Sequence, residues 1–253
     1  MLGDSVAAGY GVTKPRETPG ALLATGISRR LGRPVLLHRL AMVGAESRHL
    51  RPQVEAAVEL APDLAVVIVG GNDVTHRTDH AEAVRELVAA VRALRSVGAE
   101  VVVGTCPDLG TIRPIQPPLR WLASRWSRQL AAAQTVAVVE AGGRTVSLGD
   151  LLGPRFAADP LRMFGTDRFH PSADGYAAAA AALLPTALAA LGAGDRPRAA
   201  GIRSLPRAAV AASRQAGTEV SGASVAGRER GPAGRWAAMR HRRPPSAEVK
   251  ESQ

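Results

Sequence analysis

Three residues of this sequence have the types of a nucleophile and of the two groups that activate it. Ser5 stands in a Gly-Asp-Ser turn at the start of the chain, and Asp167 precedes His170 by three residues far downstream. A serine hydroxyl becomes a nucleophile when a histidine accepts its proton, and a carboxylate on the other ring nitrogen orients that histidine. If the fold brings them together, Ser5 is the nucleophile, His170 the general base and Asp167 the orienting group.

Two further turns carry hydrogen-bond donors. Attack on an ester carbonyl creates an oxyanion, and each donor fixed to receive it contributes about 3 to 4 kcal/mol in other hydrolases. Gly44 stands in a Val-Gly-Ala turn, and Asn72 follows two glycines. The backbone N–H groups of Ser5 and Gly44 and the side-chain amide of Asn72 would supply three donors. Singly, each of these residues has a plainer role in a cap or turn, so the prediction depends on their combination.

The elements that must position these residues alternate between strands and helices. Residues 64–69 are apolar on both faces, which is typical of a central parallel strand. Ser5, Gly44 and Asn72 each follow a predicted strand directly, and open parallel sheets bind ligands at the carboxyl ends of their strands. The turns are therefore expected to meet at one edge. The predicted strands are residues 1–2, 34–41, 64–69, 101–103 and 136–140, and the predicted helices include 18–31, 79–97, 119–134 and 171–191.

Composition divides the chain into a domain at 1–191 and a tail at 192–253. The tail is rich in Arg, Ala, Gly and Pro and has no apolar period, so we expect it to be disordered. It holds 12 Arg and Lys against 5 Asp and Glu, so +7 of the net charge of +10 belongs there and only +3 to the domain. A basic tail can bind nucleic acid or anionic lipid. We expect no nucleic acid partner, because Trp236 is the tail's one aromatic residue and no recognition motif accompanies it.

The first strand is expected to be truncated. A nucleophile at the end of a strand needs about five residues of strand before it, and only Met1 and Leu2 precede Gly3. We expect the natural chain to extend upstream, where an export signal or membrane anchor would lie. As written, no leader and no run of eighteen apolar residues is seen, so the localisation stays open between the cytoplasm and export.

Two other readings of reactive residues carry less weight. His76 and His80 are four residues apart near Asp73 and Asp79, but they straddle a helix start and lack the glutamate that zinc peptidases place beside the first histidine. We expect no metal and no cofactor. Cys106, the only cysteine, follows an apolar strand with no histidine nearby in sequence, which is typical of a small core residue.

In order and approximate spacing, four blocks of this sequence resemble those of the SGNH (GDSL-type) hydrolases. The blocks are Gly3-Asp4-Ser5, the turn at Gly44, Gly71-Asn72-Asp73 and Asp167-x-x-His170, and the resemblance covers residues 1 to about 191. It implies a flavodoxin-like three-layer α/β/α sandwich with a mostly parallel five-stranded sheet. It also implies Ser5, Asp167 and His170 as a triad, Gly44 and Asn72 in the oxyanion hole, and metal-free hydrolysis of carboxylic esters through an acyl-enzyme.

The hypothesis is a monomeric serine esterase acting on a small-molecule acyl ester. The small residues Ala7, Ala8 and Gly9 beside Ser5 favour short acyl chains. One alternative is a module on the same fold that binds acyl ligands but has lost turnover. Another makes the basic tail the functional part, docking to membrane or nucleic acid.

Overall fold

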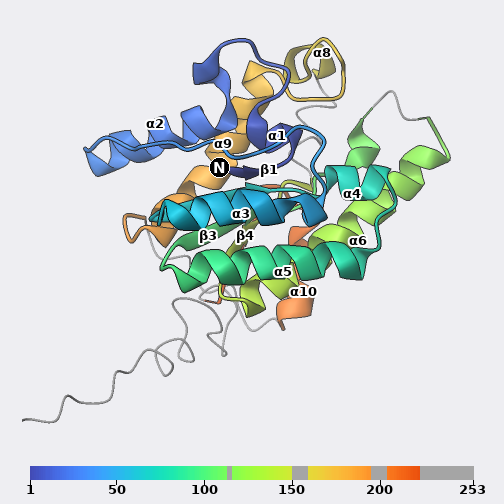
Figure 1. Cartoon of the computed structure of the whole chain (residues 1–253). Coiled ribbons are helices and arrows are strands. Elements are labelled where there is room, and N and C mark those ends of the chain that lie inside the picture. Colours follow the sequence, from blue (N-terminus) through green and yellow to red (C-terminus); the bar gives the residue numbers. More distant parts are fainter. Residues whose placement is uncertain (113–115, 150–158, 195–203, 223–253) are drawn as a thin grey trace, which may run out of the picture.

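The apolar run near residue 66 forms the central strand of the sheet, as its composition predicts. This strand is β2 (Leu64–Ile68), and its residues alternate between two cores, with Val66 and Ile68 on one face and Ala65 and Val67 on the other. A strand buried on both faces needs a layer of helices on each side. The computed structural model, which describes residues 1–112, 116–149, 159–194 and 204–222, has this three-layer arrangement (Figure 1).

The sheet has the strand order β1-β2-β3-β4-β5, with the first four strands parallel and β5 antiparallel to β4. The strands besides β2 are β1 (Leu2–Gly3), β3 (Glu100–Gly104), β4 (Arg144–Val146) and β5 (Glu219–Val220). The predicted three-layer fold with a mostly parallel five-stranded sheet is confirmed. The first strand has two residues, as its short sequence implies.

Helices cover both faces of the sheet. α2 (Pro19–Leu31) and α9 (Ala173–Ala190) pack together on one face, whereas α3 (Leu50–Glu59) and α5 (His80–Ser96) cover the other (Figure 1). The helix α5 begins as predicted, since the Asp79 carboxylate caps it. The other helices are α1 (Ser5–Ala8), α4 (Gly71–Thr75), α6 (Leu119–Glu140), α8 (Pro160–Met163) and α10 (Leu205–Ala212), with 3-10 turns η1 (Pro15–Glu17), η2 (Ser47–His49) and η3 (Leu109–Thr111).

The prediction of a strand at 34–41 was wrong, although its extended conformation was foreseen. The segment runs beside β1, and the N–H groups of Leu40 and Met42 donate to the carbonyls of Met1 and Gly3 at 2.9 and 3.0 Å. It is not one of the five strands. Because β1 has only two residues, the ladder between them stays too short for a regular strand pair.

The prediction of a strand at 136–140 was also wrong, because these residues form the last turns of α6. The valines there favour a strand by propensity. However, Leu130, Gln134 and Val138 follow one another at the spacing of a helix face, and all three are buried. The chain leaves the helix at Gly142, which has φ of 91°, and the strand follows as β4.

Part of the expected tail is ordered, so the prediction of disorder from residue 192 was wrong for residues 204–222. The helix α10 packs on α6, and β5 pairs with β4. The Arg144 guanidinium lies 3.1 Å from the Glu219 carboxylate, which also accepts a hydrogen bond from Thr186 at 3.0 Å. Residues 195–203 and 223–253 lie outside the described part of the chain.

One described helix, α9, is long and apolar enough by composition to cross a membrane. Its contacts are those of a core helix, because it packs against α2, α8, β3 and β4. Leu183 and Ala187 are fully buried in the core on that face of the sheet. Its apolar character therefore follows from its place in the fold.

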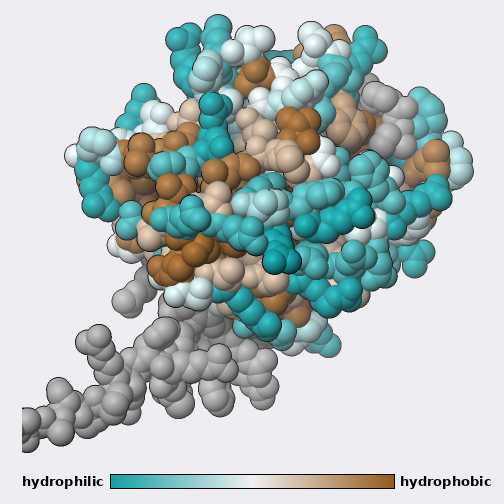
Figure 2. Space-filling model, in the orientation of Figure 1, coloured by the Kyte–Doolittle hydropathy of each residue, from teal (hydrophilic) through white to brown (hydrophobic). Residues whose placement is uncertain are grey.

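An apolar groove of about 390 Å³ opens beside the amino ends of β1 and β2. Its lining includes Leu23, Ile27, Leu60 and Val66, and Leu36 on its rim is 82% exposed. Figure 2 shows apolar side chains gathered on this side of the molecule, over α2 and α3. The turns that hold Ser5 and Asn72 lie at the opposite, carboxyl ends of the same strands, so the groove is separate from the candidate site.

Candidate active site

Ser5 lies where β1 ends and α1 begins. It is the first residue of α1, and the Asp4 carboxylate caps the helix by accepting a hydrogen bond from the Val6 N–H at 2.9 Å. Gly3 has φ of 126°, and a Cβ there would lie 1.8 Å from the Ile68 carbonyl oxygen. Only glycine fits this close approach of β1 to β2. The Gly-Asp-Ser sequence thus sets Ser5 at the carboxyl edge of the sheet.

The structure brings Ser5, His170 and Asp167 into one chain of hydrogen bonds. The Nε2 atom of His170 lies 2.9 Å from Oγ of Ser5, across 165 residues of sequence. The Nδ1 atom of the same ring lies 2.6 Å from Oδ2 of Asp167. A short contact between ring nitrogen and carboxylate fixes the tautomer with its proton on Nδ1, which leaves Nε2 free to accept the proton of Ser5.

A tight loop holds His170 and Asp167 in place. The Gly165 N–H donates to the His170 carbonyl at 2.8 Å, and Arg168 takes the left-handed φ of 54°. Oδ1 of Asp167 accepts from the N–H groups of Phe169 and His170, both at 3.0 Å. Partial burial raises the pKa of Asp167, but the hydrogen bonds from His170 and Phe169 outweigh it and lower that pKa overall. Asp167 therefore stays a carboxylate.

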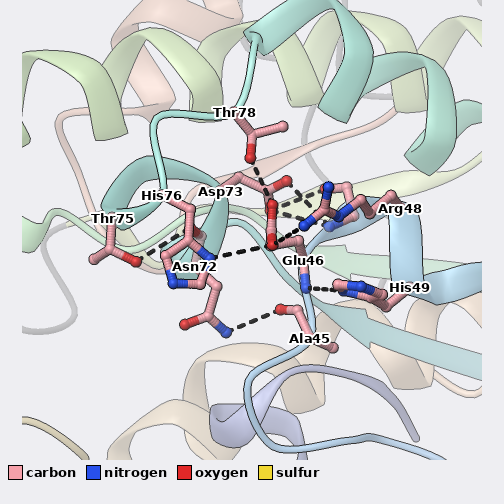
Figure 3. Close-up of polar contacts among 10 residues, drawn as sticks. Ala45, Glu46, Arg48, His49, Asn72, Asp73, Thr75, His76 and Thr78 are labelled. Carbon is pink, nitrogen blue, oxygen red and sulfur yellow. Dashed lines mark hydrogen bonds and ion pairs between the residues drawn. The ribbon is translucent and has the colours of Figure 1, made fainter.

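The turns with Gly44 and Asn72 meet beside Ser5. The segment before Gly44 is bound to β1 through Met42, and Gly44 has φ of 81°. Asn72 follows β2, and its side-chain Nδ2 donates to the Ala45 carbonyl at 2.9 Å (Figure 3). One of its amide N–H groups therefore holds the Gly44 turn, and the other has no acceptor among the described residues.

Of the three expected donors, Asn72 uses one amide N–H on the Ala45 carbonyl, whereas the backbone N–H groups of Ser5 and Gly44 have no acceptor among the described residues. The N–H of Ser5 is at the first position of α1, where a helix offers no carbonyl partner. Such donors, held by the surrounding turns, suit an oxygen that gains negative charge.

A buried carboxylate joins the two donor turns. The Glu46 side chain is 4% exposed and lies between Arg48 and His76 (Figure 3). It accepts from Thr78 Oγ1 at 2.6 Å and Arg48 Nη2 at 2.8 Å, and it lies 3.1 Å from His76 Nδ1. Burial raises the pKa of Glu46, but Thr78, His76 and Arg48 together lower it. Because the carboxylate has this many partners, it fixes the spacing between the turns.

A second buried carboxylate ties the same turns. Asp73 is fully buried and accepts from Ser47, from its N–H at 3.0 and 3.1 Å and from its hydroxyl at 3.1 Å. Sequence reasoning missed the roles of Glu46 and Asp73, because nothing local marks either one as buried. Apart from Arg48, which is two residues from Glu46, the partners described above lie 26 to 32 residues away.

The carboxyl group of Asp4, the residue before Ser5, is buried. It is 3% exposed. Burial, with a smaller contribution from the negative charge of Asp73, raises the pKa of Asp4 from 3.8 to about 7 despite the hydrogen bond from Val6. Folding therefore favours the protonated form of Asp4 between these two pH values.

We expect Asp4→Asn to stabilise the protein increasingly as the pH rises from about 4 to about 7. In this range the unfolded Asp4 loses its proton while the folded one keeps it, so the wild type loses stability as the pH rises. The full shift corresponds to roughly 4 kcal/mol, an upper limit for a site that can relax. Asparagine can still cap α1. Urea unfolding of both proteins at pH 4, 6 and 8 measures the difference, and a constant difference at all three would refute the shift.

The other reactive residues do not assemble into sites. His76 contacts Glu46 rather than His80, and no group of three or more metal-ligating side chains occurs in the described residues. Cys106 is fully buried, and its N–H donates to Gln134 at 2.8 Å. Burial raises the pKa of the Cys106 thiol well above its usual value. Its place in the core agrees with the prediction from sequence.

Comparison with known sequences gives one family. The sequence model of the GDSL-like lipase/acylhydrolase family matches residues 1–178. A GDSL-like esterase of Mycobacterium tuberculosis is 48% identical over 182 residues, which cover 71% of this chain and 58% of that protein. The chain therefore spans less than two thirds of the length of this relative.

Comparison with solved structures gives the same fold. The lipase Lip_vut3 from a goat rumen metagenome has a TM-score of 0.61 at 17% identity, with 76% of this chain and 96% of that one covered. The acetylxylan esterase Axe2 from Geobacillus stearothermophilus has a TM-score of 0.54 at 19% identity, with 76% and 92% covered. At these identities the likeness concerns the fold alone.

Proposed function

The chain belongs to the GDSL-like lipase/acylhydrolase family, and we propose that it is a serine esterase that hydrolyses carboxylic esters through an acyl-enzyme. The observation that carries the proposal is the continuous chain of hydrogen bonds from Ser5 Oγ through His170 to Asp167, at 2.9 and 2.6 Å. This arrangement suits proton transfer from the hydroxyl to the imidazole during attack.

In the proposed reaction, Ser5 Oγ attacks the ester carbonyl while His170 Nε2 takes its proton. Asp167 orients the ring and stabilises the imidazolium that forms. The oxyanion accepts hydrogen bonds from the N–H groups of Ser5 and Gly44 and from Asn72. His170 then gives its proton to the leaving alcohol, and a water activated by the same histidine releases the acid from Ser5.

We propose short acyl groups, acetyl among them. Beyond Val6, the residues Ala7, Ala8 and Gly9 near Ser5 are small, and Gly44 and Ala45 on the opposite turn are small as well. One solved structure of this fold is an acetylxylan esterase, whose acyl group is acetyl. Because that likeness lies below 25% identity, the support comes mainly from the residues around Ser5.

Labelling with a fluorophosphonate tests the proposed function. The reagent phosphonylates a serine whose base and oxyanion donors are assembled, so we expect one adduct per chain by intact mass, mapped to Ser5 by peptide analysis. Ser5→Ala and heat-unfolded wild type are the matched controls and should gain none. A folded wild type that takes no label, yet binds an acyl ligand in a fixed ratio, would indicate a binding module instead.

A further inference from the structure

Two aromatic rings lie against the imidazole of His170. The centroid of the Tyr10 ring is 4.7 Å from that of His170, and the centroid of Phe169 is 4.9 Å away, both in edge-to-face orientation. The chain has only two tyrosines and three phenylalanines. One residue of each kind therefore lies beside His170. Tyr10 is nevertheless 50% exposed and Phe169 is 36% exposed, which leaves part of both rings open to a ligand.

The backbone holds both rings at the site. The Tyr10 N–H donates to the Ser5 carbonyl at 2.9 Å, and the Tyr10 carbonyl accepts from the buried Tyr176 hydroxyl at 2.6 Å. The Phe169 N–H donates to Asp167 at 3.0 Å. Exposed aromatic rings on a rigid backbone cost little entropy when they bind, so they suit a contact surface.

The chemistry decides which part of an ester these rings would meet. In the proposed mechanism, the leaving oxygen takes its proton from His170 Nε2, so it lies about 3 Å from the imidazole. The first carbon atoms of the alcohol then lie beside the rings that flank the imidazole. The oxyanion faces Gly44 and Asn72 instead. The rings are therefore placed for the alcohol rather than for the carbonyl oxygen.

A pocket lined by both polar and apolar side chains begins at the residue next to each ring along the chain. It has a volume of about 480 Å³, and its lining includes Gly11, which follows Tyr10, and Arg168, which precedes Phe169. Thr13, Glu17 and Thr166 also line it. Side chains with hydroxyl groups and charges could bind an alcohol that carries further hydroxyl groups.

We propose that Tyr10 and Phe169 form the alcohol subsite of this enzyme and select esters whose alcohol carries a ring. The inference depends on the proposed esterase function and adds the class of leaving group to it. A ring offers a flat apolar face to the two aromatic side chains, whereas an open chain of the same size makes fewer contacts at a higher cost in entropy. Both a carbocycle and a sugar ring have this shape.

The test compares cyclohexyl acetate with 3-hexyl acetate. Both esters release a six-carbon secondary alcohol of similar acidity, so their intrinsic reactivities are close. We expect the wild type to have a higher kcat/KM for the cyclohexyl ester, and Tyr10→Ala and Phe169→Ala each to reduce this ratio by about 3- to 10-fold. Because the ratio is taken within one variant, a change in the basicity of His170 cancels.

Three controls make the outcome specific. The ratio of acetate to butyrate for a fixed alcohol should not change in the two variants, and Trp121→Ala, which removes a 67% exposed ring on α6, should leave both ratios unchanged. An acetylated methyl glycoside distinguishes a sugar from a carbocycle, because Glu17→Gln should slow only the glycoside ester. An unchanged cyclohexyl to 3-hexyl ratio in both ring variants would overturn the proposal.

Binding of the product alcohol needs no turnover and separates the two proposals. Ligand-observed NMR should detect cyclohexanol more strongly than 3-hexanol on the wild type, and the preference should disappear in Tyr10→Ala. If Ser5 takes no label but this preference exists, the esterase function fails, and Tyr10 and Phe169 bind ring alcohols without selecting a leaving group. If Ser5 is labelled but neither variant changes the preference, the subsite fails alone.

Discussion

Replacing Ser5 by alanine should lower kcat for ester hydrolysis by about 10⁴- to 10⁶-fold, as loss of the nucleophile does in other serine hydrolases. Ser5 Oγ is the only described oxygen at 2.9 Å from His170 Nε2, so the variant leaves the base with no hydroxyl to activate. Alanine fits the first position of α1 without strain. Initial rates with an activated acetate ester measure the loss, and circular dichroism checks the fold.

The base supplies the matched comparison for this experiment. His170→Ala should cost about as much as Ser5→Ala, and the double variant should lose no more than either single one, because the two residues act as a unit. Ser28→Ala on α2, where the hydroxyl bonds only the Arg33 carbonyl, should keep the wild-type rate. Activity that survives Ser5→Ala in a clean preparation would exclude the acyl-enzyme mechanism.

The parts of the fold that local pattern determines could be predicted from the sequence. The strand β2 is apolar on both faces, and α5 has both a capping aspartate and a regular apolar stripe. Each signal lies within one element, so no knowledge of the neighbours is needed. The alternation of strands and helices then implies parallel pairing and a three-layer fold.

The failed predictions concern residues whose conformation depends on distant partners. Val138 and Val139 favour a strand by type, but the helix α6 buries both of them against the rest of the core. The strand β5 exists because Val220 pairs with Thr145 and Glu219 meets Arg144, 75 residues away. The sequence around β5 is rich in Ala and Arg, and no local feature of it predicts a strand partner so far away.

The residues of the candidate site also fall into two groups, those that the sequence could predict and those that it could not. Ser5, Asp167 and His170 could be found because their residue types and order are distinctive, and the geometry then joins them. Glu46 could not be found, since an isolated glutamate is normally exposed. Only the folded chain reveals that Thr78 and Arg48 surround its carboxylate. Supporting groups of this kind have no sequence signature of their own.

Replacing Asp167 by asparagine should lower kcat by about 10³- to 10⁴-fold, a larger loss than removal of the carboxyl by alanine. Oδ1 of Asp167 accepts from two backbone N–H groups, those of Phe169 and His170. In the asparagine variant the amide oxygen must stay on these donors, so the amide NH₂ turns toward His170 Nδ1. That nitrogen must then accept, and the ring proton moves to Nε2, where it faces Ser5 and blocks proton transfer.

Alanine at position 167 does not force the His170 proton onto Nε2. The two variants are therefore expected to differ in activity. The Asp167 side chain is 37% exposed, so in Asp167→Ala water can reach His170 Nδ1 and the ring can still carry its proton there. We expect this variant to retain about tenfold more activity than Asp167→Asn at every pH from 6 to 9. An NMR experiment that reports the imidazole tautomer should place the proton on Nε2 in the asparagine variant and on Nδ1 in the wild type. If the asparagine variant were the more active of the two, the role of Asp167 in setting the tautomer would be wrong, and the carboxylate would act through its charge alone.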